Sequence, residues 1–142
     1  MDILFRTGSV IPLLLLAGLP WLSMVGCASD SGDAKASPVI SDLALDRAEL
    51  RTGMINPVGV AFSFSTEGGD LLEARIVIRA DSGKEVTVSV PVQGTDGTRA
   101  GFVSLELSFR PPEDGEYVFE ITARDENGND SNVLIETIRS VQ

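Results

Sequence analysis

The stretch Gly115-Glu-Tyr-Val-Phe-Glu-Ile-Thr-Ala-Arg-Asp125 decides the fold class of this chain. Apolar and aromatic side chains occupy every second position from Tyr117 to Ala123, and polar or charged side chains fill most of the positions between them. Successive side chains of a β-strand point to opposite faces of its sheet. This period of two therefore predicts a strand with one face buried and the other in water.

The same alternation recurs along the rest of the chain. Apolar residues fall on every second position in four earlier segments, at residues 58–64, 74–80, 86–92 and 103–109. Two further apolar segments, Val39–Leu45 and 132–138, complete a set of seven strands. Clusters of Gly, Pro, Asn and Asp separate the segments, as expected of turns. Residues 38–142 are therefore predicted to form an all-β domain, a seven-stranded antiparallel β-sandwich.

Three local features refine this prediction. Pro91 stands at a solvent-facing position, and a residue without a backbone N–H favours an edge strand. In the last strand, one register would bury Leu134 and Ile138 and the other would bury Val133 and Ile135, a conflict that a β-bulge would resolve. Helical spacing is confined to one possible turn near residues 47–50.

Residues 112–132, from Pro-Glu-Asp-Gly-Glu-Tyr to Gly-Asn-Asp-Ser-Asn, resemble the sixth strand and final hairpin of bacterial immunoglobulin-like and fibronectin-type-III-like domains. Their recurring pattern Gly-x-Tyr-x-Phe-x-Ile-x-Ala-x-Asp is present here. The resemblance implies an immunoglobulin-like sandwich in which Tyr117 is the tyrosine corner, its hydroxyl bonded to backbone just upstream. The chain lacks the core Trp that fibronectin type III domains carry in the second strand, which leaves the exact family open.

The first 26 residues have the features of an export signal. One basic side chain, Arg6, precedes an apolar stretch of 13 residues at positions 10–22, which Pro and Gly interrupt. A membrane-spanning helix needs about 20 apolar residues. The stretch therefore fits the apolar part of a signal peptide better than a permanent span.

The sequence Met24-Val25-Gly26-Cys27 resembles the lipobox of bacterial lipoproteins, although that family prefers Leu where Met24 stands. The resemblance implies that residues 1–26 are removed and that Cys27 becomes the lipid-bearing first residue, anchored in a membrane. Ala28 stands where Asp favours inner-membrane retention, which implies the outer membrane if the cell has one. The alternative is an ordinary secretory signal beside an incidental Cys, which would leave an exposed reactive thiol.

Residues 27–37 form the predicted tether between this lipid and the domain. They consist mostly of Ser, Ala, Asp and Gly, and no large apolar residue occurs among them. Such a segment buries too little apolar surface to become ordered, and its composition is typical of a flexible linker.

The composition excludes several function classes. The chain has no His and one Cys, which rules out imidazole metal sites, His-dependent nucleophilic catalysis, thiolate zinc sites and internal disulfides. Beyond residues 1–26 it has 20 acids and 10 bases, and the bases do not cluster, which argues against nucleic acid. Paired carboxylates exist, but no insertion is long enough to form a catalytic cleft. We therefore expect no enzymatic activity and no cofactor.

One loop carries candidate calcium ligands. Four candidate ligands fall within six residues: Asp125, Asn127, Asn129 and Asp130. Calcium binds carboxylate and amide oxygens such as theirs, and the spacing imitates the start of an EF-hand loop. Gly128 stands at the fourth position of this loop, so a hairpin turn with a positive φ at Asn127-Gly128 is favoured over a metal site. A complete site would need further ligands from the neighbouring loop 67–70.

Together, these features predict a lipid-anchored protein of the cell envelope whose sandwich is a non-enzymatic structural or protein-interaction module. Its predicted partners are the membrane, reached through lipid on Cys27, and another envelope protein. The alternative is a ligand-binding module for a glycan or for calcium that uses the loops at one end of the sandwich. Aromatic loop residues would favour a glycan, and the predicted loops contain none outside Phe102 at a strand start.

Overall fold

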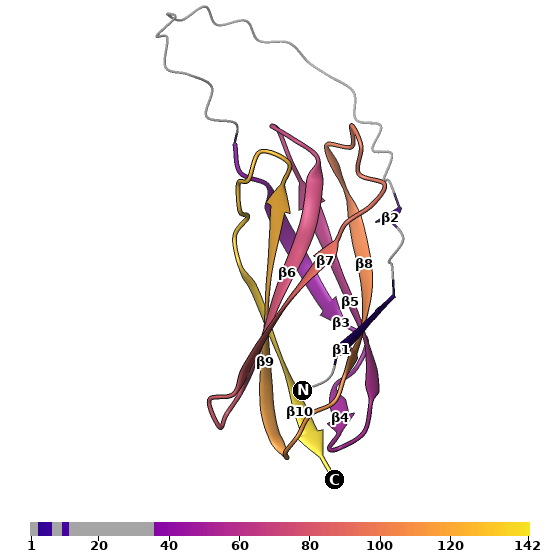
Figure 1. Ribbon diagram of the computed structural model, residues 1–142. Helices are drawn as coiled ribbons and strands as arrows, with labels where there is room; N and C mark the ends of the chain where they lie inside the picture. The colour runs from indigo at the N-terminus through magenta and orange to yellow at the C-terminus, as the bar shows by residue number, and fades with distance from the viewer. Residues whose placement is uncertain (1–2, 7–9, 12–35) are drawn as a thin grey trace, which may run out of the picture.

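The computed structural model describes residues 3–6, 10–11 and 36–142 (Figure 1). The predicted lipobox at 24–27, including Cys27, and most of the predicted signal peptide and tether lie outside these residues. The described residues form ten strands and no helix, so none of their elements is a helix that could span a membrane.

From β3 onward the strands follow one another along the chain with short connections. In chain order they are β1 (Ile3–Arg6), β2 (Val10–Ile11), β3 (Val39–Leu45), β4 (Glu49–Arg51), β5 (Asn56–Ser65), β6 (Leu71–Ala80), β7 (Glu85–Pro91), β8 (Ala100–Phe109), β9 (Gly115–Asp125) and β10 (Leu134–Val141).

These strands pair into two sheets. The first has the order β1-β8-β5-β3, with β2 also paired to β8, and the second has the order β4-β10-β9-β6-β7. All pairs are antiparallel except that of β10 with β4, which is parallel. The predicted all-β architecture of two sheets is confirmed. The predicted count of seven strands is wrong, because residues 36–142 contain eight.

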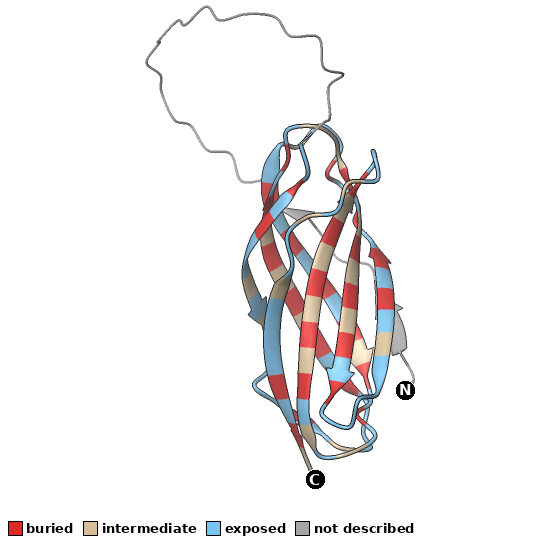
Figure 2. Ribbon diagram, turned by 90° about the vertical axis from the view of Figure 1, so that its left-hand side faces the viewer, coloured by how far each residue is buried: buried red, intermediate tan, exposed pale blue. Residues whose placement is uncertain are grey.

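The core lies between the sheets and is built from alternate residues of each strand (Figure 2). In β9 every second residue from Tyr117 to Asp125 is buried. The ring of Phe109 lies 5.4 Å from that of Tyr117 and 6.0 Å from that of Phe119, edge-to-face in both cases. This geometry suits the ring quadrupoles and joins β8 of one sheet to β9 of the other.

The eighth strand, β4, replaces the helical turn expected near residues 47–50. Leu50 is 1% exposed while Glu49 and Arg51 are exposed, which is the alternation of a strand. Leu50 lies opposite Ser140 of β10. The helical expectation is wrong because three residues are too few to display a period, and their pairing partner comes from the far end of the sequence.

Asn56 organises the turn that joins β4 to β5. Its side chain is buried, and its Nδ2 donates to the carbonyls of Arg51 and Met54, both at 2.9 Å. Its Oδ1 accepts from the N–H of Arg51 at 2.9 Å. A buried amide bonded through both its donor and its acceptor fixes this turn against the end of the core.

The last strand adopts one of the two registers considered from the sequence. Ile138 is buried and Ile135 is 60% exposed, so Leu134 and Ile138 share the inner face. The pairing of β10 with β9 continues without a register shift, and the expected bulge is therefore wrong. Register shifts occur instead in β3 and in β6. Pro91 ends β7, which is an edge strand, as predicted.

Candidate functional site

The strands run along the sandwich, so its loops gather at two ends (Figure 1). The tether end holds the start of the domain at residue 36, with the loops 66–70, 92–99 and 126–133. The far end holds the turn 52–55, the loops 81–84 and 110–114, and the last residue. Each end contains one candidate site.

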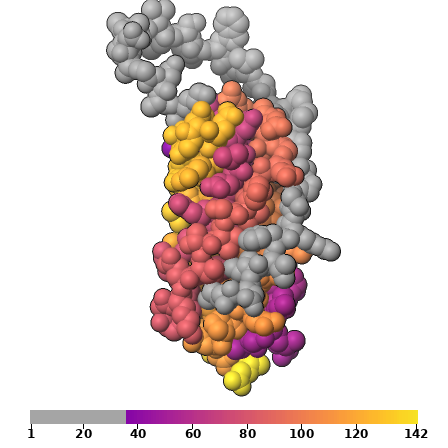
Figure 3. Space-filling view, viewed as in Figure 1, coloured from indigo at the N-terminus to yellow at the C-terminus, as the bar shows by residue number. Residues whose placement is uncertain are grey.

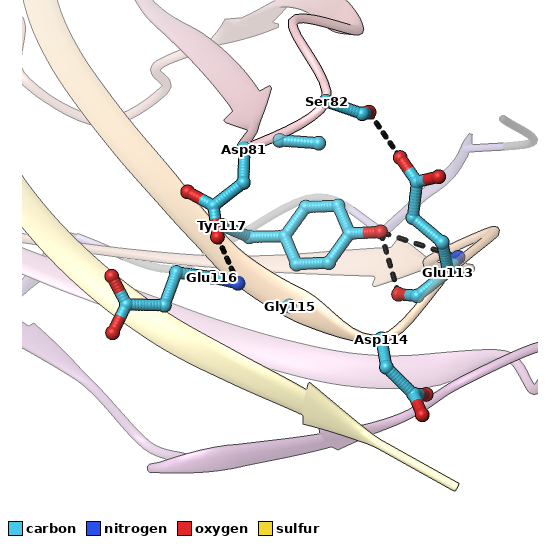
Figure 4. Close-up of a pocket in the computed structure, with 8 residues that line it drawn as sticks. Asp81, Ser82, Glu113, Asp114, Gly115, Glu116 and Tyr117 are labelled. Carbon is cyan, nitrogen blue, oxygen red and sulfur yellow. Dashed lines mark hydrogen bonds between the residues drawn. The ribbon is translucent and has the colours of Figure 1, made fainter.

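The far end contains a pocket of about 130 Å³ between the loops 81–84 and 110–114 (Figure 4). Eight residues line it: Ala80, Asp81, Ser82, Glu113, Asp114, Gly115, Glu116 and Tyr117. Four of these eight residues carry carboxylates, which accept hydrogen bonds but cannot donate them. The lining therefore suits a positively charged or N–H-bearing group.

Tyr117 lines this pocket from β9 and fixes one of its loops. Its side chain is fully buried, its hydroxyl donates to the carbonyl of Glu113 at 2.9 Å, and the N–H of Glu113 donates to the hydroxyl at 3.4 Å. Burial raises the pKa of Tyr117, so the phenol remains a neutral donor at neutral pH. This is the upstream backbone bond that the tyrosine-corner resemblance implies.

Polar bonds tie the two far-end loops together. Asp81 accepts from the backbone N–H of Glu116 at 3.1 Å. The carboxylate of Glu113 accepts from the hydroxyl of Ser82 and pairs with the Lys84 ammonium at 3.2 Å. The bond from Ser82, and then the bond from Lys84, lower the pKa of Glu113. The two loops that form the walls of the pocket are therefore joined to each other by side-chain bonds.

At the tether end, the predicted calcium loop is a closed turn. Asp125 is buried; its Oδ1 accepts from the N–H groups of Asn127 and Asn129 at 2.9 and 2.8 Å. Its Oδ2 accepts from Nδ2 of Asn129 at 3.1 Å. Burial acts to raise the pKa of Asp125, but these bonds outweigh it and the pKa is lowered. Gly128, at φ 83°, provides the positive φ that the hairpin turn requires.

Asp130, the other acid of the candidate calcium set, has different partners. Its Oδ1 and Oδ2 accept from Nε and Nη2 of Arg124 at 2.8 and 3.2 Å, and Arg75 lies 3.6 Å away. The bond from Arg124 lowers the pKa of Asp130. The two carboxylates of the candidate set are thus directed to different groups. Within residues 36–142, no three acidic side chains are grouped in a way that could hold a metal ion.

The loops 66–70 and 126–133 do meet, as a complete calcium site would require (Figure 3). Nδ2 of Asn127 donates to the carbonyl of Gly68 at 3.0 Å, and the N–H of Glu126 donates to the carbonyl of Asp70 at 2.9 Å. The carboxylate of Asp70 accepts from the N–H of Gly97 at 2.8 Å. Each of these three hydrogen bonds therefore has a backbone group as one of its partners.

The acids of the far-end pocket are not singled out by the sequence. Acids occur throughout the chain, and both far-end loops read as ordinary turns. A signal was available in the Tyr117 motif, because a tyrosine corner folds its upstream loop back over the end of the core. This folding places the acids on either side of Gly115 next to the β6–β7 hairpin loop at residues 81–84.

Comparison with known proteins shows a likeness of fold and no family membership. No family model and no curated protein sequence matches the chain. Among solved structures, it is similar to the Pseudomonas fluorescens alkylpurine DNA glycosylase AlkC, which was bound to DNA containing an abasic site analog. The TM-score is 0.52 at 14% identity, over 77% of this chain and 32% of that one.

Two other solved structures show weaker likeness. A family 76 glycoside hydrolase from a bovine Bacteroides thetaiotaomicron strain has a TM-score of 0.47 at 18% identity, over 75% of this chain and 21% of that one. The Bacillus subtilis sporulation control protein Spo0M has a TM-score of 0.44 at 14% identity, over 75% of this chain and 50% of that one. This chain spans half or less of each of these proteins, and the likeness concerns the fold of one domain.

Proposed function

We propose that this chain is a bacterial lipoprotein, held in the cell envelope by lipid on Cys27, and that its sandwich is a non-enzymatic protein-interaction module. The apolar stretch at 10–22 and the lipobox-like sequence ending at the single Cys support the anchor. The lack of His anywhere in the sequence supports a role without nucleophilic catalysis.

The position of the acidic pocket relative to the start of the domain carries this proposal. Residue 36 and the pocket lie at opposite ends of strands that are ten or eleven residues long. A ten-residue strand is about 33 Å long, and a tether of the length of residues 27–37 extends to at most about 40 Å. Because the tether joins the domain at the end opposite the pocket, lipid on Cys27 would leave the pocket accessible to another protein.

The strand arrangement supports a place among immunoglobulin-like and fibronectin-type-III-like domains. Strands β3, β5 and β8 share one sheet, and β10, β9, β6 and β7 share the other, so the chain crosses between sheets several times, as in a Greek key. The bond from Tyr117 to the Glu113 carbonyl adds the tyrosine corner of those domains.

The proposed partner presents Lys or Arg side chains to the far end. The chain has a net charge of −10, and four of the residues that line the pocket are acidic. Complementary charge accelerates and orients association more than it adds affinity, so we expect a salt-sensitive rate of binding.

Site-specific photo-crosslinking in the producing cell tests this proposal. A crosslinking amino acid at Asp114 probes the far end, and the same amino acid at Asp96 probes the tether end; both positions are exposed. We expect a protein adduct of one defined mass from position 114 and none from position 96. The Cys27→Ser variant should lose most of that adduct because it lacks the lipid that anchors the mature protein. Equal adducts from both ends, or an undiminished adduct in the Cys27→Ser variant, would contradict the proposal.

A further inference from the structure

The edges of the two sheets differ in how well they are protected. Edge strands carry unpaired N–H and C=O groups that can accept another strand, and natural proteins usually blunt such edges. The second sheet ends in β4 and β7, and the first ends in β3 on one side. On its other side, β8 is followed only by the short strands β1 and β2.

Three of these edges carry protective features. Strand β4 has three residues, and β7 ends in Pro91, which has no N–H to donate. In β3 the register shifts between Ser41 and Ala44, and Asp42 adopts a positive φ of 54°. Each feature interrupts the straight row of backbone groups that a new strand would need.

Strand β8 has none of these features. It is ten residues long, and its pairing with β5 runs without a register shift from Ala100 to Phe109. It contains no Pro, Lys or Arg, and Glu106 is its only charged residue. Phe102 is 37% exposed on its outer face. This edge is therefore regular, long and weakly charged.

Residues 3–6 and 10–11 of the chain itself lie along this edge. Strand β1 pairs antiparallel with β8 from Ile3 opposite Phe109 to Arg6 opposite Glu106. Strand β2 continues with Val10 opposite Val103 and Ile11 opposite Phe102 (Figure 1). Five of these six paired residues of the N-terminal segment are apolar, so the edge accepts an antiparallel, mainly apolar strand.

We propose that β8 is a strand-acceptor edge, and that once residues 1–26 are removed it binds an extended, mainly apolar strand of a partner protein by antiparallel pairing. The proposal rests on the proposed function in one respect, since removal of the signal peptide vacates the edge. Backbone hydrogen bonds would supply affinity, and apolar side chains at alternate positions would supply selectivity.

A second copy of the chain fits this edge less well than a partner strand. Antiparallel pairing of β8 with its own copy would reverse one sandwich relative to the other. The two tether ends would then point in opposite directions, about 33 Å apart along strands of this length. Two lipids in one leaflet would force one tether close to its full extension of about 40 Å. A partner strand brings no such constraint.

Binding of a labelled peptide tests the proposal. The probe is a fluorescent peptide of residues 3–11, Ile-Leu-Phe-Arg-Thr-Gly-Ser-Val-Ile, added to the lipoprotein purified from membranes in mild detergent. A scrambled peptide of the same composition controls for uptake by the micelle. We expect the native sequence to bind at least tenfold more tightly than the scrambled one.

Two N-methylated peptides separate strand pairing from simple apolar contact. One carries N-methyl groups at Ile3, Phe5 and Val10, and the other at Leu4, Arg6 and Ile11. In an antiparallel pair, only alternate residues exchange hydrogen bonds with the neighbouring strand. We therefore expect one set to weaken binding at least tenfold and the other to leave it within about threefold. Equal binding of both sets, or no binding of the unmodified peptide, would overturn the proposal.

The mass of the same purified protein distinguishes failure of the strand-acceptor proposal from failure of the proposed processing. If residues 1–26 are still attached, the proposed processing fails, whatever the peptide does. If they are absent and the peptide does not bind, the strand-acceptor proposal fails while the anchor stands. A dimer that the peptide disperses would replace the partner strand by a second copy and overturn the proposed occupant.

Discussion

The two ends of the sandwich use carboxylates in different ways. At the tether end, Asp125 is buried and accepts three hydrogen bonds from its own loop. At the far end, Asp114 and Glu116 are exposed beside a pocket, and Glu113 bonds to the side chains of the facing hairpin. The density of acids in a loop therefore does not locate a binding site. A carboxylate that already accepts hydrogen bonds from the backbone of its own loop is not available to a ligand.

The comparison predicts its largest effect for Asp125→Ala. The substitution removes three hydrogen bonds to a buried carboxylate, so we expect the free energy of unfolding to fall by about 3 kcal/mol. The matched substitution Asp114→Ala at the far end should change it by less than about 0.5 kcal/mol. Urea unfolding of both variants measures this difference, and equal losses would remove the distinction between the two ends.

Acid sensitivity gives a second readout of Asp125. Its pKa in the folded protein lies below the unfolded value of about 3.9. Its contribution is therefore complete above that pH and is lost as the pH falls through the folded pKa. We expect Asp125→Asn to lose less stability than the natural protein between about pH 5 and about pH 2. Parallel pH profiles would show that Asp125 is not ionised in its turn.

A smaller effect is expected from Tyr117→Phe, which keeps the ring beside Phe109 but removes the hydroxyl bonded to the Glu113 carbonyl. We expect the free energy of unfolding to fall by about 1–2 kcal/mol. Thermal unfolding measured beside Glu113→Gln, which leaves that backbone bond in place, isolates the contribution of the hydroxyl. A change near zero would make Tyr117 an ordinary core aromatic.

The smallest effect is expected from calcium. Because Asp125 and Asp130 already bind backbone N–H groups and Arg124, the melting curves with calcium and with a chelator should coincide at constant ionic strength. An occupied site at 100 times its Kd would add about 2.7 kcal/mol of stability. A rise of several degrees with calcium that Asp125→Ala removes would establish a metal site at the tether end.

The positions of most strands were predictable from the sequence, because a half-buried strand alternates apolar with mainly polar residues, as from Tyr117 to Ala123. The sequence alone could not reveal β4, since burial of Leu50 depends on β10, which lies at the other end of the domain. The sequence alone also does not determine the register of β10. Its pairing with β9 determines that Ile138, and not Ile135, faces the core.

The far-end pocket and the β8 edge depend on pairings between distant segments. Loops 81–84 and 110–114 become neighbours only because β6 pairs with β9. The openness of β8 depends on which strand follows it in the sheet, and no local pattern encodes strand order. The turn after Asp125 was predictable from the sequence, because Asn-Gly favours a hairpin turn. The hydrogen bonds that Asp125 accepts within that turn were not.

The mass of the N-terminal peptide of the protein purified from membranes tests the central claim most directly. The account predicts that this peptide begins at Cys27 and carries a diacylglyceryl group on the thiol, with the mass of a further acyl chain where the new amine is modified. A peptide that begins at Met1, or one that contains Cys27 with a free thiol, would contradict the account.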